Sequence, residues 1–156
     1  MSIPRTYRRL VLLAAGGSLG LMLGAWGFQY IGDMPPCNLC YWQRYPHYTA
    51  IGIGVLAFLL GGARLASLGA LAALTTAGIA AYHTGVERGW WEGPSSCTAA
   101  STSELSTEQL FDQIMAAPLI RCDEVPWEMF GLSMASWNML ASLALAVIWI
   151  MAARRA

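Results

Sequence analysis

The stretch LVLLAAGGSLGLMLGAWGFQYI, residues 10–31, runs for 22 residues without a charged side chain. A helix needs roughly 20 apolar residues to cross a bilayer, so this stretch alone predicts a membrane span. Three further uncharged stretches follow, at residues 45–63, 65–82 and 135–153. None alternates as a barrel strand would, and none carries the polar stripe of a soluble bundle helix. We therefore expect an all-α fold, a membrane four-helix bundle with one transmembrane helix over each stretch.

The composition supports the same fold class. Of the 156 residues, 56% are hydrophobic and 12% are charged, whereas a soluble domain is about 25% charged. Four spans and one sizeable loop use the whole length, so we expect a single integral membrane domain over residues 1–156. The net charge is zero, and no basic run indicates nucleic-acid binding.

Glycine recurs at every fourth residue of the first stretch, at Gly16, Gly20 and Gly24. This spacing places the three residues on one face of a helix. Small residues on a helix face let a second helix approach closely, so we expect a neighbouring helix to pack against that face.

Charge divides the chain between the two sides of the membrane. The arginines outside the longer loops are Arg5, Arg8, Arg9, Arg64, Arg154 and Arg155. With four spans these positions share one side, while all nine acidic residues fall in the loops of the other side, at about 32–44 and 83–134. The positive-inside rule makes the arginine side cytoplasmic. We therefore expect both termini in the cytoplasm and both loops outside.

All four cysteines lie in the two outer loops, Cys37 and Cys40 in the first and Cys97 and Cys122 in the second. Disulfides persist in oxidising compartments, so an even number of cysteines on this side predicts two bridges. Four cysteines allow three pairings. Proximity in the sequence favours Cys37–Cys40 and Cys97–Cys122.

The first pair lies in PPCNLCYWQRYP, residues 35–46. A Cys-x-x-Cys bridge closes a very small ring, so it constrains little of the unfolded chain and is a poor structural staple. It is a good redox pair, because the second thiol is near enough to resolve a mixed disulfide. Structural zinc needs four ligands, and the other two cysteines are separated by 24 residues. Redox chemistry is the favoured interpretation, with a zinc site and a structural bridge as alternatives.

Pro35 and Pro36 predict that a helix begins just after them, with both cysteines in its first turn, where the helix N-terminus stabilises a thiolate. Arg44 follows Cys40 by one turn on the same face. A permanent cation just inside a span indicates a functional site, and a side chain that extends to the interface is the alternative. The surrounding aromatic residues fit an interfacial belt or a site for a flat, electron-accepting ring; they are Tyr41, Trp42, Tyr45 and Tyr48.

In the second loop, Ser106 and Gln109 are spaced as a capping box, which predicts a short amphipathic helix over Thr107–Ala116, lying on the membrane surface. Cys97 and Cys122 bracket this helix. A bridge that closes the loop would stabilise the protein by about 3 kcal/mol on the chain-entropy model. This second pair therefore fits a structural bridge as well as an exchangeable one.

The motifs PCNLCYWQR (36–44), PSSC (94–97) and RCDEVPWEMFGLSMASWN (121–138) resemble those of the disulfide bond formation protein B (DsbB) family, the bacterial inner-membrane thiol oxidases. The resemblance covers nearly the whole chain. It implies a quinone-dependent thiol:disulfide oxidoreductase of the bacterial inner membrane, with both cysteine loops in the periplasm. The implied cofactor is ubiquinone or menaquinone, and the implied partner is a periplasmic thioredoxin-fold dithiol oxidase (DsbA-like).

The resemblance also implies a role for each site residue. A thiolate of the reduced partner attacks Cys97, and the freed Cys122 attacks Cys37. Cys40 is then released as a thiolate beside a bound quinone, which Arg44 helps to hold. All four cysteines are thus expected to be catalytic.

The chain has two histidines, and each is expected near the outer end of a span. By position alone, both are interfacial histidines. The family has a histidine near the top of its third span, so the resemblance places His83 in the quinone site. His47 matches no family residue and is expected to remain interfacial.

Two other functions remain as alternatives. A vitamin K epoxide reductase-like enzyme is also a four-helix, quinone-linked thiol enzyme, but its Cys-x-x-Cys pair lies near the last span, whereas the pair here precedes the second. The non-enzymatic alternative is a membrane scaffold with two structural disulfides.

Overall fold

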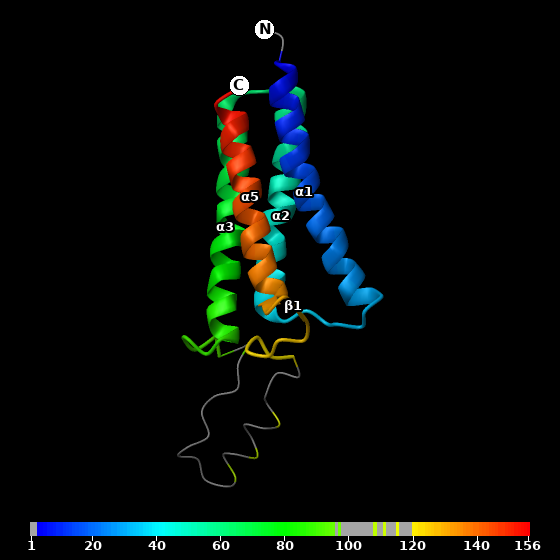
Figure 1. Ribbon diagram of the computed structural model, residues 1–156, viewed down its shortest axis with the longest axis vertical. Helices are drawn as coiled ribbons and strands as arrows, with labels where there is room; N and C mark the ends of the chain where they lie inside the picture. The colour runs from blue at the N-terminus through cyan, green and yellow to red at the C-terminus, as the bar shows by residue number, and fades with distance from the viewer. Residues whose placement is uncertain (1–2, 96, 98–107, 109–110, 112–114, 116–119) are drawn as a thin grey trace.

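The computed structural model describes residues 3–95, 97, 108, 111, 115 and 120–156. These residues form four long helices and one short β-hairpin (Figure 1). The helices are α1 (Arg5–Tyr30), α2 (Asn38–Leu60), α3 (Ala63–Glu87) and α5 (Met134–Ala153), and the hairpin pairs β1 (Glu128–Met129) antiparallel with β2 (Leu132–Ser133). The predicted helical bundle is confirmed, whereas the hairpin was not predicted.

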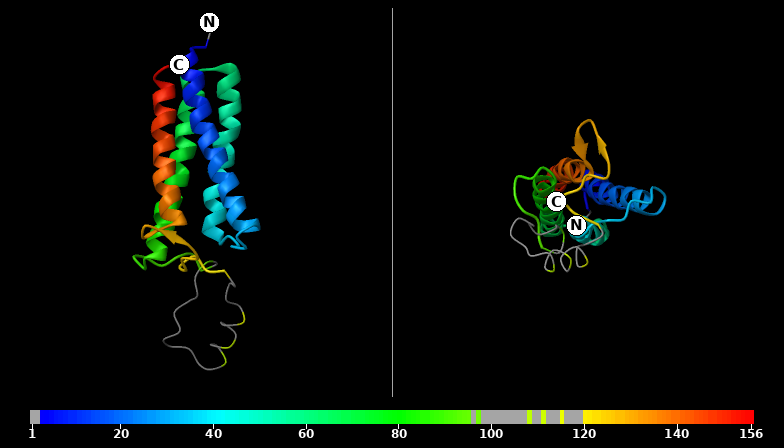
Figure 2. Two further views of the ribbon diagram at one scale, coloured as in Figure 1. Left: turned by 45° about the vertical axis from the view of Figure 1, so that its right-hand side comes forward. Right: turned by 90° about the horizontal axis from the view of Figure 1, so that it is seen from below.

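The four helices run along the long axis of the molecule (Figure 1) and form a bundle when viewed end-on (Figure 2). α3 packs against α2 and α5, and α1 packs against the same two helices. Both chain termini and the α2–α3 turn lie at one end, which we call the terminal end (Figure 1). The six arginines that the sequence assigns to one side therefore lie together there. The opposite end, which carries Cys37 and Cys122, is called the cysteine end.

Three of the four predicted spans meet the requirements for crossing a membrane. α1, α3 and α5 are each long enough and apolar enough. α2 has 23 residues, but its first turns contain Gln43, Arg44 and His47, which make it less apolar. The fourth span therefore stays a prediction.

The predicted spans are shorter than the helices. The predicted spans are 10–31, 45–63, 65–82 and 135–153, and the segments between the long helices are 31–37, 61–62 and 88–133. The helix bounds do not mark where the membrane lies, so the span and loop bounds stay predictions. The main differences are the first turn of α1, the first two turns of α2, which the two prolines predict to be helical, and the last turn of α3. Polar side chains in these turns bond to other helices, so the chain stays helical where an uncharged stretch ends.

The terminal end is closed by close helix contacts. Trp149 of α5 is fully buried, and a Cβ atom added to Gly69 of α3 would lie 2.6 Å from its indole. Gly54 of α2 likewise meets Ala15 of α1 too closely to accept a side chain. Glycine at these positions lets the helix backbones approach one another.

The predicted packing face of Gly16, Gly20 and Gly24 is wrong. Among the described residues, no atom of a neighbouring helix lies within 4 Å of a Cβ position built on any of the three. The α1 glycine that meets another helix is Gly17, against which Leu145 of α5 packs. A glycine at every fourth residue does define one face of α1, but α5 contacts the adjacent face, where Gly17 lies. Gly20 and Gly24 line a cavity instead.

The hairpin leads directly into α5. Its two turn residues, Phe130 and Gly131, have φ of 54° and 74°, and positive φ at both positions suits a two-residue turn between twisted strands. Ser133 then caps α5, since its Oγ accepts the N–H of Ser136 at 3.2 Å. The predicted surface helix over Thr107–Ala116 lies, apart from three isolated positions, outside the described residues and stays a prediction.

Candidate redox site

The first cysteine pair opens α2, as the two prolines predict. Cys37 is the N-cap, and its Sγ accepts the backbone N–H of Cys40 at 3.2 Å. The two sulfur atoms lie 2.8 Å apart. The hydrogen bond that the Cys37 thiol donates to the Cys40 sulfur raises the pKa of Cys37, and burial of Cys37 adds to the effect. A single negative charge on the pair therefore favours Cys40.

The second pair is Cys97–Cys122, joined by a disulfide as expected. Both residues are almost fully buried, and the backbone N–H of Cys122 donates to the Cys97 carbonyl at 2.8 Å. Cys37 and Cys40, by contrast, are free thiols in this structure. The bridge expected between them is therefore not formed here, although the two sulfurs are adjacent.

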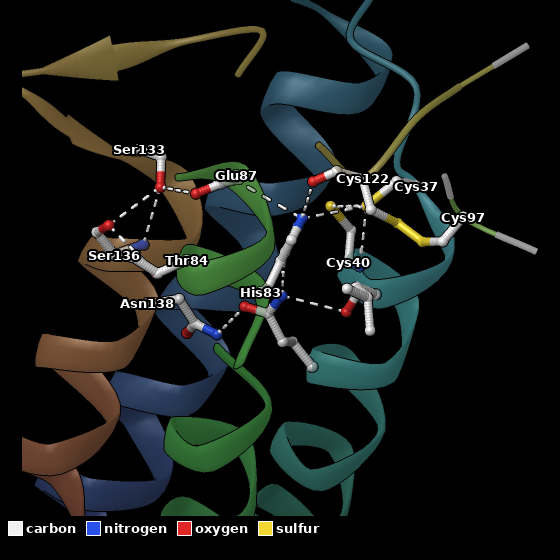
Figure 3. A network of polar contacts seen from close by, with 12 residues as sticks. Cys37, Cys40, His83, Thr84, Glu87, Cys97, Cys122, Ser133, Ser136 and Asn138 are labelled. Carbon is white, nitrogen blue, oxygen red and sulfur yellow. Dashed lines mark hydrogen bonds and ion pairs between the residues drawn. A yellow bond between two sulfur atoms is a disulfide. The ribbon is translucent and has the colours of Figure 1, made fainter. Parts of the chain in front are cut away.

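The two pairs meet at the cysteine end (Figure 3). Cys37 belongs to the same buried cluster as Cys97 and Cys122. The sulfurs of Cys37 and Cys122 and a ring nitrogen of His83 all lie within 4.8 Å of one another. This distance suits exchange between the two loops after small movements. A structural zinc site needs four ligands, and the described residues bring only these three together, one of them already in a disulfide.

His83 stands between the two pairs. Its Nε2 lies 3.7 Å from Cys37 Sγ and 3.1 Å from the backbone carbonyl oxygen of Cys122. Its helical neighbour Glu87 places a carboxylate oxygen 3.8 Å from the same nitrogen. The other oxygen of Glu87 accepts a hydrogen bond from Ser133, at the start of α5. The structure therefore places His83 beside Cys37 and Cys122, and its role in a quinone site, which the resemblance implies, stays a prediction.

A cavity of about 330 Å³ adjoins the cysteines. Its walls come from α1, α2, α3, α5 and the segments just before α2 and before β1. Cys37, Cys40, Arg44 and His83 all line it, and most of the remaining lining is apolar. A cavity with an apolar wall and a few convergent polar groups is typical of a small-molecule site.

Arg44 turns into this cavity. It is only 8% exposed, and its Nη1 donates to Gln29 Oε1 of α1 at 2.6 Å. The guanidinium also lies over the Tyr41 ring, 5.2 Å from the ring centre. No carboxylate of the described residues pairs with it within 4.0 Å. A buried cation held by neutral groups is available to a ligand oxygen, and this position argues against a side chain that extends away to the interface.

The aromatic residues that follow Cys40 are exposed, and the cavity is lined by other aromatic residues. Tyr41, Trp42, Tyr45 and Tyr48 are all at least 39% exposed in the bundle, as an interfacial belt would be. None of them lines the cavity, so their positions favour the belt, and a ring site among them stays a prediction. The aromatic residues in the cavity wall are Phe28, Trp127 and Trp137.

Sequence reasoning missed the polar interior of the bundle. Gln43 and Asn138 are linked at 2.8 Å between α2 and α5, and Gln43 also reaches His83. His47 is fully buried, with Nε2 3.0 Å from Asn138 Oδ1, so the interfacial placement of His47 is wrong. It is buried because α5 supplies a polar partner for it. Glu87 was also missed, and its spacing of four residues from His83 was the available signal.

Comparisons with known proteins identify the family. The family model described as Disulfide bond formation protein DsbB matches residues 7–152. Disulfide bond formation protein B 1 of Burkholderia lata is 32% identical over 158 residues, covering 92% of this chain and 88% of the relative. Disulfide bond formation protein B of Dechloromonas aromatica is 31% identical over 134 residues, covering 80% and 78%.

A further relative, "Uncharacterized protein RP370" of Rickettsia prowazekii, is 24% identical over 145 residues, covering 90% of this chain and 84% of the relative. No solved structure matches the chain. The family match includes all four cysteines and all four helices, and three of these helices suit a membrane. The chain therefore belongs to the disulfide bond formation protein B family, and it is a membrane protein and a thiol oxidoreductase.

Proposed function

We propose that this protein reoxidises a periplasmic thioredoxin-fold dithiol oxidase (DsbA-like) and passes the electrons to a membrane quinone. The observation that carries the proposal is the meeting of both cysteine pairs beside one largely apolar cavity. Cys37 and Cys122 lie close enough for exchange between the loops, and Cys40 and Arg44 line the same cavity.

The relay begins at the Cys97–Cys122 disulfide. A thiolate of the reduced partner attacks Cys97 Sγ, a mixed disulfide forms, and the Cys97–Cys122 bond breaks with Cys122 leaving as a thiolate. Cys122 then attacks Cys37 Sγ in an oxidised Cys37–Cys40 pair. A Cys37–Cys122 bond forms, the Cys37–Cys40 bond breaks, and Cys40 leaves as a thiolate.

Two further exchanges restore the second loop. The second thiolate of the partner attacks its own mixed disulfide, so the oxidised partner departs and Cys97 is released as a thiolate. Cys97 then attacks Cys122, which re-forms Cys97–Cys122 and releases Cys37. The first pair is now fully reduced, and the partner has lost two electrons.

A bound ubiquinone or menaquinone would supply the final chemistry, as the acceptor of two electrons and two protons when the Cys37 and Cys40 thiols re-form their bond. The cavity residues fit this group. The apolar wall suits a flat ring, and the Arg44 guanidinium is suited to donate to a ring oxygen and to oppose negative charge on it. Cys40 lines the same cavity, so the reactive sulfur and the cation act on one site.

We further propose that the whole chain, residues 1–156, is one domain with four spans in the bacterial inner membrane. The six arginines at the terminal end support a cytoplasmic location for that end. The cysteine end then faces the periplasm, where disulfides persist. α2 would be the fourth span, with Gln43 and Arg44 turned toward the bundle interior and away from lipid.

The two alternatives are less well supported. A scaffold with two structural bridges does not require a free thiol pair that lines a cavity, with Cys37 buried and Cys40 partly buried. In a vitamin K epoxide reductase-like arrangement the Cys-x-x-Cys pair lies late in the chain, but here it opens α2.

The proposal is tested with purified protein freed of quinone in detergent micelles. A reduced thioredoxin-fold dithiol partner is added with ubiquinone or menaquinone, and partner thiols and quinone absorbance are followed together. We expect one quinone reduced for each partner disulfide formed, and little oxidation without quinone. Partner oxidation that proceeds equally well without quinone, or no oxidation with either quinone, would contradict the proposal.

A further inference from the structure

A chain of hydrogen bonds links the two histidines through the bundle interior. Gln43 Nε2 lies 2.8 Å from His83 Nδ1, Asn138 Nδ2 lies 2.8 Å from Gln43 Oε1, and His47 Nε2 lies 3.0 Å from Asn138 Oδ1. The four side chains come from α2, α3 and α5. Buried polar groups of this kind require matched donors and acceptors at every contact, so the contacts fix where each proton lies.

The Gln43 amide has only one satisfactory orientation. Its Nε2 lies 3.1 Å from the Leu39 carbonyl oxygen, which can only accept a hydrogen bond. Its Oε1 receives the amide N–H of Asn138. Turning the amide over would place two acceptors together at Leu39 and two donors together at Asn138. The remaining N–H of Gln43 therefore points at His83 Nδ1, and this ring nitrogen must be the unprotonated one.

The other side of the His83 ring leads independently to the same tautomer. Nε2 lies 3.1 Å from the Cys122 carbonyl oxygen, which also can only accept. Nε2 must therefore carry the ring proton. Cys37 Sγ at 3.7 Å and Glu87 Oε1 at 3.8 Å face the same N–H. Every group around Nε2 is thus an acceptor, or becomes one when Cys37 is a thiolate.

We propose that Gln43 is a positioning residue that holds neutral His83 as a hydrogen-bond donor at the cysteines. Held this way, His83 does not remove a proton from Cys37, because its only unprotonated nitrogen is occupied by Gln43. Its N–H instead fixes the Cys122 backbone next to Cys37 and stabilises negative charge on the Cys37 sulfur. This reading of turnover rests on the proposed function, whereas the tautomer itself does not.

Nitrogen-15 NMR of the imidazole rings tests the tautomer directly. The protein is prepared in micelles without a histidine tag, so its two histidines give the only imidazole signals, and His47→Gln assigns them. We expect His83 with a protonated Nε2 and an unprotonated Nδ1. A protonated Nδ1 in the unaltered protein would overturn the proposal, whatever any variant does.

Two substitutions separate positioning from simple packing. In Gln43→Glu, the carboxylate accepts from Nδ1, so we expect a proton to appear on Nδ1 of His83. In Gln43→Leu, Nδ1 loses its partner while the Cys122 carbonyl still favours a proton on Nε2, so we expect a minor population of the Nδ1-protonated tautomer to appear. The His47 signal, with its proton on Nε2 toward Asn138, reports whether the rest of the hydrogen-bond chain is intact, and helix content by circular dichroism is the control for an intact bundle. If His83 keeps its original tautomer in both variants while the His47 signal is unchanged, Gln43 does not position it.

Turnover provides the functional arm. We expect Gln43→Leu to lower kcat for partner oxidation about tenfold, the equivalent of one lost hydrogen bond, with the partner KM unchanged. An unchanged kcat would overturn the role in turnover. The two hypotheses fail separately, because absent quinone-linked activity in the unaltered protein leaves the NMR result standing, and a wrong tautomer leaves the oxidase activity standing.

Discussion

The two ends of the bundle use the same four helices in opposite ways. At the terminal end, glycines meet side chains of neighbouring helices directly, and Trp149 is completely enclosed. At the cysteine end, α1 leans away from α5 (Figure 1), and the space between the helices is a cavity lined by Cys40 and Arg44. The terminal end is the closed end, and its contacts fix how the helices pack. The cysteine end is the open end, and it holds the reactive groups. We therefore expect substitutions at the terminal end to change stability and substitutions at the cysteine end to change activity.

The largest effect is expected from the open end, with Cys40→Ser. The proposed relay ends at this sulfur, so a hydroxyl there leaves no pair to re-form, and steady-state turnover with quinone should be abolished. The measurement is quinone-dependent oxidation of a reduced thioredoxin-fold partner. Retained turnover would exclude Cys40 from the reaction. Helix content by circular dichroism should stay unchanged, because Cys40 is not part of the packing at the terminal end.

A smaller effect is expected from Arg44→Gln, also at the open end. Loss of a charge-assisted hydrogen bond of about 1.5 kcal/mol should raise the quinone KM about tenfold, with a smaller change in kcat. Arg44→Lys retains the positive charge, so its quinone KM should lie between that of the unaltered protein and that of Arg44→Gln. The matched control is Arg88→Gln, which neutralises an arginine outside the cavity lining. If Arg44→Gln and Arg88→Gln behave alike, the Arg44 guanidinium does not hold the quinone.

The smallest effect is expected at the closed end, with Gly69→Ala. Alanine normally favours a helix over glycine by about 1 kcal/mol, but here its methyl group would lie 2.6 Å from the Trp149 ring. We expect a lower Tm in detergent and an unchanged quinone KM. Gly78→Ala is the control on the same helix, because nothing lies within 4 Å of its Cβ position, and it should not lower Tm. Equal Tm changes in the two variants would show that the closed end is not tightly packed at Gly69.

The sequence predicts the apolar parts of this protein better than the polar parts. Uncharged stretches locate the helices, and the two prolines place Cys37 at a helix start, because both signals are local. The start of α2 follows from the prolines, whereas the last turn of α3 lies beyond its uncharged stretch, where His83 contacts Gln43 of α2. The burial of His47 depends on Asn138, which is 91 residues away in the sequence. No local sequence pattern predicts a partner at that separation. The prediction that a helix packs against Gly16, Gly20 and Gly24 was wrong for the same reason, because residue spacing defines a helix face but not which helix lies against it.

The arrangement of the cysteines could be only half predicted. The Cys97–Cys122 pairing follows from proximity in the sequence, and the structure contains it. The approach of Cys122 to Cys37 joins residues of different loops and depends on how the second loop returns over α3. His83, bonded to the Cys122 carbonyl, makes that approach visible in the structure.

The most direct test of the account is whether Cys37 and Cys122 pair with each other. The double variant Cys40→Ser, Cys97→Ser leaves only these two thiols, and mild oxidation with diamide followed by mass spectrometry of the digested protein reports their state. The control, Cys37→Ser with Cys97→Ser, leaves Cys40 and Cys122, and Cys40 is not in the cluster within 4.8 Å. The account predicts a rapid, nearly complete Cys37–Cys122 bridge within one molecule and a slower reaction in the control. Thiols that stay reduced, or that react no faster than the control pair, would contradict it.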